Sequence, residues 1–274
     1  MVMTLNIWSN TKTLDGYVPE LRFTTDKAVA QVALVGGKTI DLSEFPRLRG
    51  IFKTGVGRDN VPLDEARRRG VLCEFPSLKT CAIIYEETAS FTCHLILKCL
   101  FADVGDFAQW SKRDRPALAA RELLVLGAGN IGGRVAAKMR EFLRVSTFDV
   151  AANRQEELEP MMRRADCITL HIPLNDRTKD FIDAQKLAWM KDGAALVNTA
   201  RGAVVVEDAL RTELTSGRMR AAFDVFWQEP YTGKLLELPP DRYLVSPHVA
   251  SNCREFIAGT ANDFRAFLRE LEGR

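Results

Sequence analysis

The feature that most constrains the fold is the regular alternation of strand-like and helix-like segments after residue 121. Short apolar segments of the strand type occupy residues 122–127, 144–149, 167–173, 194–199, 221–226 and 243–248. Segments with helical spacing of apolar residues lie between them, at 131–143, 158–164, 183–190 and 207–216. Such alternation predicts an α/β fold with a doubly wound parallel sheet and right-handed crossovers.

The N-terminal third contains a second, smaller set of such segments. Apolar runs at 5–8, 30–35 and 49–55 are typical of strands, and residues 62–69 are typical of a short helix that ends before Gly70. One further amphipathic helix is expected near the C-terminus, with an apolar face of Phe256, Ile257, Thr260, Ala261, Phe264, Phe267, Leu268 and Leu271. The sequence does not decide whether this helix packs on the main sheet or returns to the N-terminal region.

Composition limits the classes of partner. The 274 residues contain 38 Lys and Arg against 36 Asp and Glu, a net charge of +2 that does not favour nucleic acid. The most apolar stretch, residues 88–97, is ten residues long, about half of the ~20 that a membrane span needs. Residues 1–10 lack the pattern of a secretory leader, so a cytoplasmic location is expected. Six cysteines show no metal-ligand spacing, which predicts reduced thiols and no metal site.

A glycine-rich turn follows the strand-like segment 122–127. Gly127, Gly129 and Gly132 stand in GxGxxG register, with Asn130 and Ile131 between the last two. In a dinucleotide site the first glycine allows the tight turn, the second lets the backbone approach the pyrophosphate, and the third lets helix and strand pack closely. The phosphates then meet the positive end of the helix. The turn therefore predicts a dinucleotide site.

An acidic residue at the end of the next strand indicates which dinucleotide. Asp149 lies 22 residues after Gly127, where a carboxylate can accept hydrogen bonds from the ribose hydroxyls. The same carboxylate would repel a 2′-phosphate, so NAD is favoured over NADP. Arg154, five residues further on, could meet a 2′-phosphate and leaves NADP open.

The three histidines differ in context. His94 lies within a mostly apolar helical segment and is interpreted as a helix residue without chemistry. His171 ends a strand of the buried type and is expected to line the cofactor cleft. His248 follows Pro247 at the end of a strand, the edge where doubly wound sheets bind their ligands.

Two other polar residues stand at such strand ends. Arg201 follows the segment 194–199, and Glu229 follows the segment 221–226. A single arginine after a strand is usually a solvated loop residue. An arginine, a glutamate and a histidine after three successive strands of one nucleotide-binding sheet predict a catalytic site.

Beyond these residues, the sequence resembles the D-isomer-specific 2-hydroxyacid dehydrogenases. The resemblance depends on GAGNIGGRVA, TLHIPLNDRTKDFID, MKDGAALVNTARGAVVVEDAL, AAFDVFWQEP and SPHVAS, in the order of that family. It implies a Rossmann-type NAD-binding domain over residues 89–251 and a smaller, flavodoxin-like substrate domain from 1–88 plus 252–274. It also implies an active site between the domains and a homodimer formed through the NAD-binding domain.

The resemblance further implies roles for single residues. Arg201 would orient the substrate, His248 would be the acid/base and Glu229 its carboxylate partner. Backbone N–H groups of Val56 and Gly57 would bind the substrate carboxylate. The cofactor would be held by the glycine turn, by Asp149 and by four residues of the cleft. Asp224 would contact the nicotinamide carboxamide. These cleft residues are His171, Pro173, Thr199 and Ala200.

The implied reaction is the NAD-dependent interconversion of a 2-oxo acid and a D-2-hydroxy acid by hydride transfer at C2. A guanidinium fork suits the carboxylate and carbonyl of a 2-oxo acid, and an imidazole suits proton transfer near neutral pH. Two alternatives stay open: a non-catalytic NAD-binding regulator, and a dehydrogenase of formate or phosphite. Glu229 disfavours the formate version, because formate enzymes of this scaffold have a glutamine there. The sequence does not indicate which side chain the substrate has.

Overall fold

The computed structural model describes residues 5–274, which form two compact units. Among the described residues, one unit consists of 5–84 and Asn252–Arg274, and the other of Tyr85–Ser251. The predicted boundary at residue 88 and this one both fall within helix α2, Leu78–Leu100. Part of the segment 1–10, for which no leader is predicted, lies outside the described residues.

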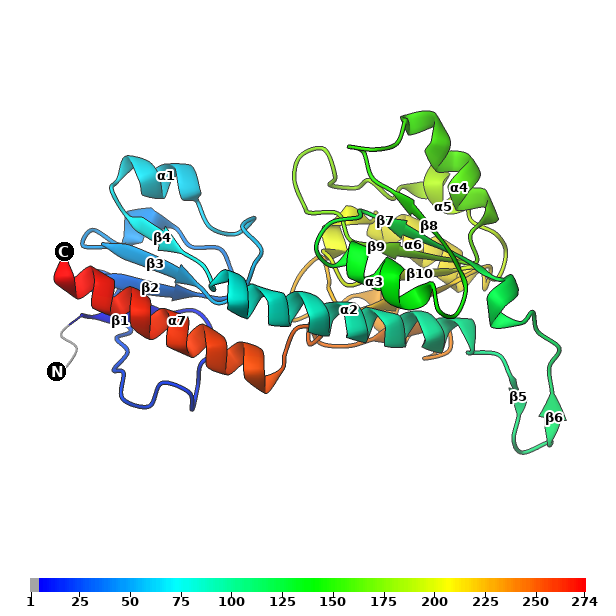
Figure 1. Ribbon diagram of the computed structural model, residues 1–274, viewed down its shortest axis with the longest axis horizontal. Coiled ribbons are helices and arrows are strands. Elements are labelled where there is room, and N and C mark those ends of the chain that lie inside the picture. The colour runs from blue at the N-terminus through cyan, green and yellow to red at the C-terminus, as the bar shows by residue number, and fades with distance from the viewer. Residues whose placement is uncertain (1–4) are drawn as a thin grey trace. The chain divides into compact units, whose positions relative to one another are not determined.

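The larger unit is built on a six-stranded parallel sheet with the order β12-β11-β10-β9-β7-β8 (Figure 1). The strands are β7 Glu122–Leu126, β8 Arg144–Phe148, β9 Cys167–Leu170, β10 Ala195–Asn198, β11 Arg220–Phe223 and β12 Tyr243–Val245. The strand order reverses between β7 and β9. In open sheets of this kind, ligands bind at that reversal, beyond the carboxyl ends of the strands.

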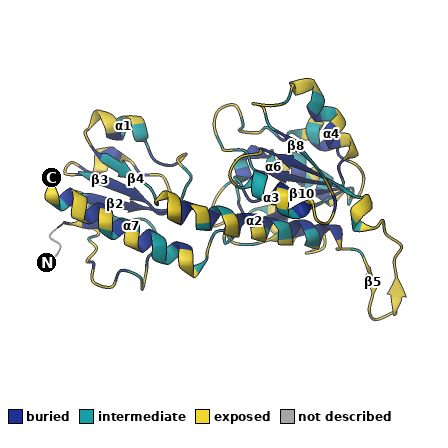
Figure 2. Cartoon of the chain, viewed as in Figure 1, coloured by how far each residue is buried: buried dark blue, intermediate teal, exposed yellow. Residues whose placement is uncertain are grey.

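Helices cover both faces of this sheet. Strand residues alternate between two buried clusters, so that Leu124 and Ile168 face one side while Leu123 and Val197 face the other. The first face is covered by α4 Leu158–Arg164, α5 Ala184–Trp189 and α6 Glu207–Thr215, and the second by α3 Gly132–Met139 and α2. Figure 2 shows the strands as the buried centre of the unit. The doubly wound arrangement predicted from the alternation is therefore confirmed.

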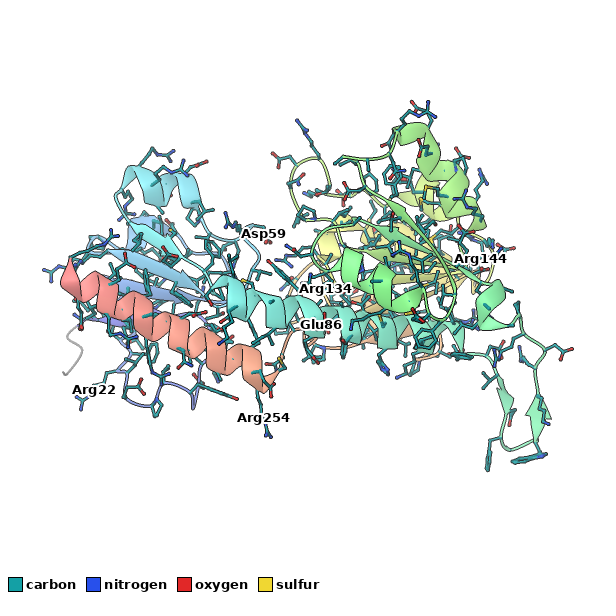
Figure 3. All side chains as sticks on the ribbon, in the orientation of Figure 1. Arg22, Asp59, Glu86, Arg134, Arg144 and Arg254 are labelled. Carbon is teal, nitrogen blue, oxygen red and sulfur yellow. The ribbon has the colours of Figure 1, made fainter. Side chains whose placement is uncertain are left out.

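An ionic contact joins the two helices of the second face. Arg134 Nε of α3 lies 3.4 Å from Glu86 Oε2 of α2, and Lys138 contacts the same carboxylate. Figure 3 shows Glu86 and Arg134 side by side between the two helices. Since α3 begins at the glycine turn, this contact helps to fix the turn against α2.

The smaller unit has a four-stranded parallel sheet in the order β1-β2-β3-β4. Its strands are β1 Ile7–Ser9, β2 Val32–Val35, β3 Gly50–Lys53 and β4 Leu72–Glu74, and helix α1, Leu63–Arg68, precedes β4. An isolated parallel bridge from Ile7 to Phe23 extends the edge of the sheet beside β1. The order including this edge is the one found in flavodoxin-like sheets.

Helix α7, Arg254–Gly273, returns to the N-terminal unit and settles the question that the sequence left open. Phe264 is fully buried, with its ring centroid 5.2 Å from that of Phe52 on β3. A Cβ on Gly50 would lie 2.5 Å from the Leu271 side chain, so β3 and α7 approach closely at this glycine. The helix thus completes the core of the smaller unit.

Strand β4 and the two strands of a small hairpin were not expected from the sequence pattern. Strand β5, Gly105–Asp106, pairs with β6, Ser111–Lys112, and the hairpin projects from the larger unit (Figure 1). Short 3₁₀ helices occur at Leu42–Glu44, Leu118–Ala120, Gln155–Glu157, Gly202–Val204 and Lys234–Glu237. Elements of two to four residues are too short to produce a periodic signal.

Two other expectations concern reduced cysteine thiols and membrane-spanning helices. All six cysteines are free thiols, and three of them, Cys81, Cys99 and Cys167, are buried. Burial raises the pKa of Cys99 to about 12, so its thiol stays protonated. Across residues 5–274, no helix combines the length and the apolar character that crossing a membrane requires.

Candidate active site

The glycine turn has the geometry that a dinucleotide requires. Gly127 adopts φ 92°, and a Cβ on it would lie 2.7 Å from the carbonyl oxygen of His171. A Cβ on Gly132 would lie 1.9 Å from the carbonyl oxygen of Gly127. Around Gly129, in contrast, a Cβ would meet no described atom within 4 Å. The outer glycines are thus required by packing, while the middle one faces open space that a pyrophosphate could enter.

The backbone between these glycines is held from α3. Arg134 donates a hydrogen bond from Nη1 to the carbonyl oxygen of Asn130 at 2.5 Å. Ile131 precedes the first residue of α3 and packs against the cluster beneath the helix. The N-terminus of the helix therefore points its N–H groups toward the turn in a fixed geometry.

Asp149 follows β8 directly and bridges two loops. Its Oδ2 accepts a hydrogen bond from the N–H of Ala128, and its Oδ1 accepts one from the N–H of Ala151, both at 3.0 Å. These hydrogen bonds hold the pKa of Asp149 below its usual range, so the carboxylate is ionised. The side chain of Arg154 is engaged with Glu157, at 3.2 Å between Nε and Oε1.

His171 lies against the glycine turn after β9. Burial lowers the pKa of His171 to about 3, so the imidazole is neutral at physiological pH. Its Nε2 lies 3.0 Å from Thr169 Oγ1. Pro173, two residues on, accepts a hydrogen bond from Thr178 Oγ1 at 2.5 Å. A neutral, packed imidazole fits a wall of the cofactor site and does not fit a proton donor.

Hydrogen bonds fix the turn that contains Arg201. The buried Asn198 side chain donates from Nδ2 to the carbonyl oxygen of Arg201 at 2.9 Å and accepts from the N–H of Ala200 at 3.0 Å. Thr199 Oγ1 lies 2.9 Å from Thr92 Oγ1 of α2. The sequence reasoning missed Asn198 and Thr92. Asparagine often accepts a hydrogen bond from the N–H two residues further on, so an asparagine at the end of a strand was a signal that could have identified Asn198.

Glu229 and His248 form a direct pair. His248 Nδ1 lies 2.8 Å from Glu229 Oε2, and Glu229 Oε1 accepts a hydrogen bond from the N–H of Phe226 at 3.1 Å. The two side chains are 36% and 41% exposed, Glu229 and His248 respectively, so a small molecule can reach the pair. The sequence had predicted this partnership from the family resemblance alone.

The ionisation of Glu229 reflects its neighbours. Burial raises the pKa of Glu229, but the hydrogen bond with His248 and the charges of His248 and Arg201 outweigh this effect. The pKa therefore lies below the usual range of a glutamate. A Cβ on Gly202 would lie 2.1 Å from the carbonyl carbon of Phe226, so the segments that contain Arg201 and Glu229 touch through their backbones.

Asp224 is fully buried at the end of β11. Its Oδ1 accepts hydrogen bonds from Ser246 Oγ at 2.6 Å and from the N–H of Val249 at 2.9 Å, and its Oδ2 accepts one from the N–H of Ala250 at 2.9 Å. The carboxylate thus binds the loop around His248, a function that sequence reasoning missed. The predicted contact of Asp224 with a nicotinamide carboxamide stays a prediction.

Val56 and Gly57 belong to the smaller unit and follow β3. They are partly exposed, and the loop before them is anchored by the N–H of Thr54, which donates to the carbonyl oxygen of Val35 at 2.9 Å. Beside them the guanidinium of Arg58 stacks on the ring of Phe75, with 4.8 Å to the ring centroid. The binding of the substrate carboxylate by the N–H groups of Val56 and Gly57 stays a prediction.

A match to a family model shows which protein family the chain belongs to. The model described as "D-isomer specific 2-hydroxyacid dehydrogenase, NAD binding domain" matches residues 103–250, more than half of the chain. The chain belongs to this family. The resemblance seen in the sequence is therefore confirmed, and with it the predictions of an oxidoreductase and of a Rossmann-type fold.

Named relatives of this 2-hydroxyacid dehydrogenase support the same assignment. A hydroxypyruvate reductase of Thermotoga maritima is 32% identical over 79% of this chain and 76% of its own. A glyoxylate reductase of Aeropyrum pernix is 33% identical over 78% of this chain and 70% of its own.

Solved structures share the fold. The D-lactate dehydrogenase of Aquifex aeolicus, in complex with NAD and lactic acid, superposes with a TM-score of 0.81 over 97% of this chain and 96% of its own, at 24% identity. A D-isomer-specific 2-hydroxyacid dehydrogenase of Xanthobacter autotrophicus, in complex with NADPH, has a TM-score of 0.68 over 98% of this chain and 95% of its own, at 23% identity. Both cofactors thus occur on this fold.

Two glycine substitutions separate cofactor binding from packing. Gly129→Ala should fold normally because its Cβ enters open space, but we expect it to weaken NADH binding about tenfold by obstructing the pyrophosphate. Gly132→Ala should instead lower the melting temperature, because its Cβ meets the carbonyl oxygen of Gly127. NADH fluorescence titration and thermal unfolding measure the two effects. Equal NADH affinity in Gly129→Ala and the wild type would contradict the predicted site.

Proposed function

We propose that this 2-hydroxyacid dehydrogenase reduces small 2-oxo acids to D-2-hydroxy acids with NADH, and catalyses the reverse oxidation. The observation that supports this most is the Glu229–His248 pair, at 2.8 Å and open to a small molecule, beside the charge of Arg201. The pair follows strands of the same sheet as the glycine turn. The named relatives act on hydroxypyruvate and glyoxylate, which makes these two acids the first substrates to test.

NADH, when bound, supplies the hydride that is transferred to C2 of the substrate. The protein orients and polarises the reactants. Arg201 binds the carboxylate and the C2 carbonyl oxygen through its guanidinium fork. The loop of Val56 and Gly57, in the smaller unit, is proposed to supply N–H donors for the substrate carboxylate.

His248 then delivers the proton. Because Nδ1 is engaged with Glu229, the proton comes from Nε2 and goes to the oxygen on C2 as negative charge develops there. The imidazolium becomes a neutral imidazole, and the substrate becomes a hydroxy acid. Oxidation runs the same steps in reverse and begins with neutral His248. Glu229 keeps the ring in one orientation and stabilises its protonated form.

A turnover assay with Arg201→Lys tests this function. A panel of glyoxylate, hydroxypyruvate and pyruvate is reduced with NADH by the wild type, and the lysine variant should lose about 100-fold in kcat/KM, since an ammonium cannot reproduce the bidentate fork. Arg154→Lys, far more exposed, serves as the control.

The alternatives give different results in that assay. A wild type that binds NADH but reduces none of the three acids would support a non-catalytic regulator, and oxidation of formate or phosphite would support that class of dehydrogenase. Wild-type kcat/KM in Arg201→Lys would remove Arg201 from the site.

The pH dependence of reduction should reveal Glu229. Because its pKa lies below the usual glutamate range, the side chain is charged throughout the neutral and alkaline range and favours the imidazolium. Glu229→Gln removes that charge and with it the electrostatic stabilisation of a protonated imidazole. We expect the alkaline limb of kcat/KM for reduction to move down by about one pH unit. The exposed Glu237→Gln is the control, and an unmoved limb in Glu229→Gln would show that Glu229 does not act on His248.

We infer that NAD is preferred to NADP. The ionised carboxylate of Asp149 would repel a 2′-phosphate, and the guanidinium of Arg154 is engaged with Glu157. Asp149→Asn retains one acceptor for the loop but removes the charge, so it should narrow the ratio of kcat/KM for NADH over NADPH about tenfold. Steady-state kinetics with both cofactors measure the ratio. A wild type that works better with NADPH would refute this interpretation of Asp149.

We also infer a homodimer formed through the larger unit. The hairpin of β5 and β6 exposes Phe107 at 87% and Trp110 at 77%, and Figure 2 shows it exposed. Residues 103–115 contain three acidic and three basic side chains, so two copies related by a twofold axis can match opposite charges. The acidic residues are Asp103, Asp106 and Asp114, and the basic ones are Lys112, Arg113 and Arg115.

Sedimentation velocity tests the dimer. The wild type should sediment as a dimer, and Trp110→Asp should shift it to a monomer because a buried, unpaired carboxylate is costly at an interface. Phe142→Asp, at a phenylalanine that is 50% exposed elsewhere on the unit, should leave the dimer intact. A dimeric Trp110→Asp would place the interface elsewhere.

A cytoplasmic location is proposed as well, since six free thiols suit a reducing compartment.

A further inference from the structure

We propose that Asp224 is a positioning residue that holds the loop of residues 246–250, so that the ring of His248 stays against Glu229. This inference rests on the proposed function, because it concerns how the proton donor is oriented. It assigns to the buried carboxylate a task that differs from cofactor binding.

The hydrogen bonds of Asp224 enclose His248 on both sides. Ser246 Oγ donates from the residue two positions before it, and the N–H groups of Val249 and Ala250 donate from the two residues after it, at 2.6 to 2.9 Å. An ionised carboxylate offers about four acceptor positions, and three are used by this loop. Hydrogen bonds to a charged group are the stronger ones, and this carboxylate is fully buried.

The backbone of His248 needs such support. His248 has φ 53° and is one of three non-glycine residues with positive φ in the described part of the chain. A residue with a Cβ adopts this left-handed conformation only where its surroundings hold it there. The donors to Asp224 lie on either side of that residue, so they can hold it together with the hydrogen bond from the N–H of His248 to the carbonyl oxygen of Ser246 at 3.0 Å.

Asp224 and Glu229 belong to the same segment after β11. The N–H of Asp224 is tied to the carbonyl oxygen of Asn198 at 3.0 Å, which fixes the start of this segment to the neighbouring strand. One end of the segment therefore holds the backbone of the His248 loop, and the other end binds the His248 ring. If the first contact is lost, the ring can leave Glu229 without any change in Glu229 itself.

Two variants test this role with the full-length protein. Ser246→Ala removes one donor, and Asp224→Asn places an amide NH₂ where one of the backbone N–H groups now finds an acceptor. In both we expect kcat for reduction to fall about tenfold and the alkaline limb of its pH profile to move to lower pH, because His248 loses the charge of Glu229. NADH affinity should stay within about twofold. Ser216→Ala, which removes a hydroxyl that bonds the carbonyl oxygen of Glu213, is the matched control and should change nothing.

A second measurement detects the backbone effect directly. Glycine tolerates a positive φ, so His248→Gly should melt at a higher temperature than His248→Ala. In the Asp224→Asn background the loop can relax, and this advantage of glycine should shrink. If Asp224→Asn does not fold, His248→Gly and His248→Ala are compared in the Ser246→Ala background, where Asp224 has lost one hydrogen bond to the loop.

The outcomes separate this inference from the proposed function. An active His248→Gln would mean that the proton donor is another group and would refute the proposed function. If His248→Gln is inactive, unchanged pH profiles in Ser246→Ala and Asp224→Asn, or an undiminished advantage of glycine, would overturn the role of Asp224 alone. A large loss of NADH affinity in Asp224→Asn, with the pH profile unmoved, would instead favour a contact with the nicotinamide carboxamide.

Discussion

The structure of the larger unit depends on a parallel sheet that is buried on both faces. Because helices cover each face, most strand residues, such as Leu124 and Val197, are apolar, and the buried Thr169 of β9 has a hydrogen-bond partner in His171. The polar side chains of the candidate site lie where the strands end. The parallel direction places all carboxyl ends at one edge, so residues far apart in the sequence, such as Arg201 and Glu229, become neighbours there.

The loops at this edge owe their shape to buried polar groups that have hydrogen-bond partners in the loops. Asn198 holds the turn before Arg201, and Asp224 holds the loop around His248. An unsatisfied buried amide or carboxylate would be costly, which restricts each loop to the conformation that supplies the partners. The close backbone contact between Gly202 and Phe226 adds a steric restriction of the same kind. Together these contacts place the reactive side chains with little freedom.

Charge follows the same logic at the cofactor and acid/base positions. Asp149 is kept ionised by backbone N–H groups, whereas His171 is kept neutral by burial. Glu229 stays ionised because the positive charges beside it outweigh its partial burial. The imidazole of His171 is thus excluded from proton transfer, while that of His248 has the counter-charge of Glu229, although both histidines follow strands of the same sheet.

Features that depend on local chemistry could be predicted from the order of the amino acids. The period of apolar residues indicated the strands and helices, the glycine register indicated the dinucleotide turn, and the position of Arg201, Glu229 and His248 after strands indicated the candidate site. Three other features became known from the fold: α7 packs on the smaller unit, Thr92 contacts Thr199, and Asp224 accepts hydrogen bonds from the His248 loop. The physical reason is that periodicity and turn chemistry act over a few neighbouring residues. The partner of a packed face or of a buried carboxylate is chosen by residues that only folding brings near.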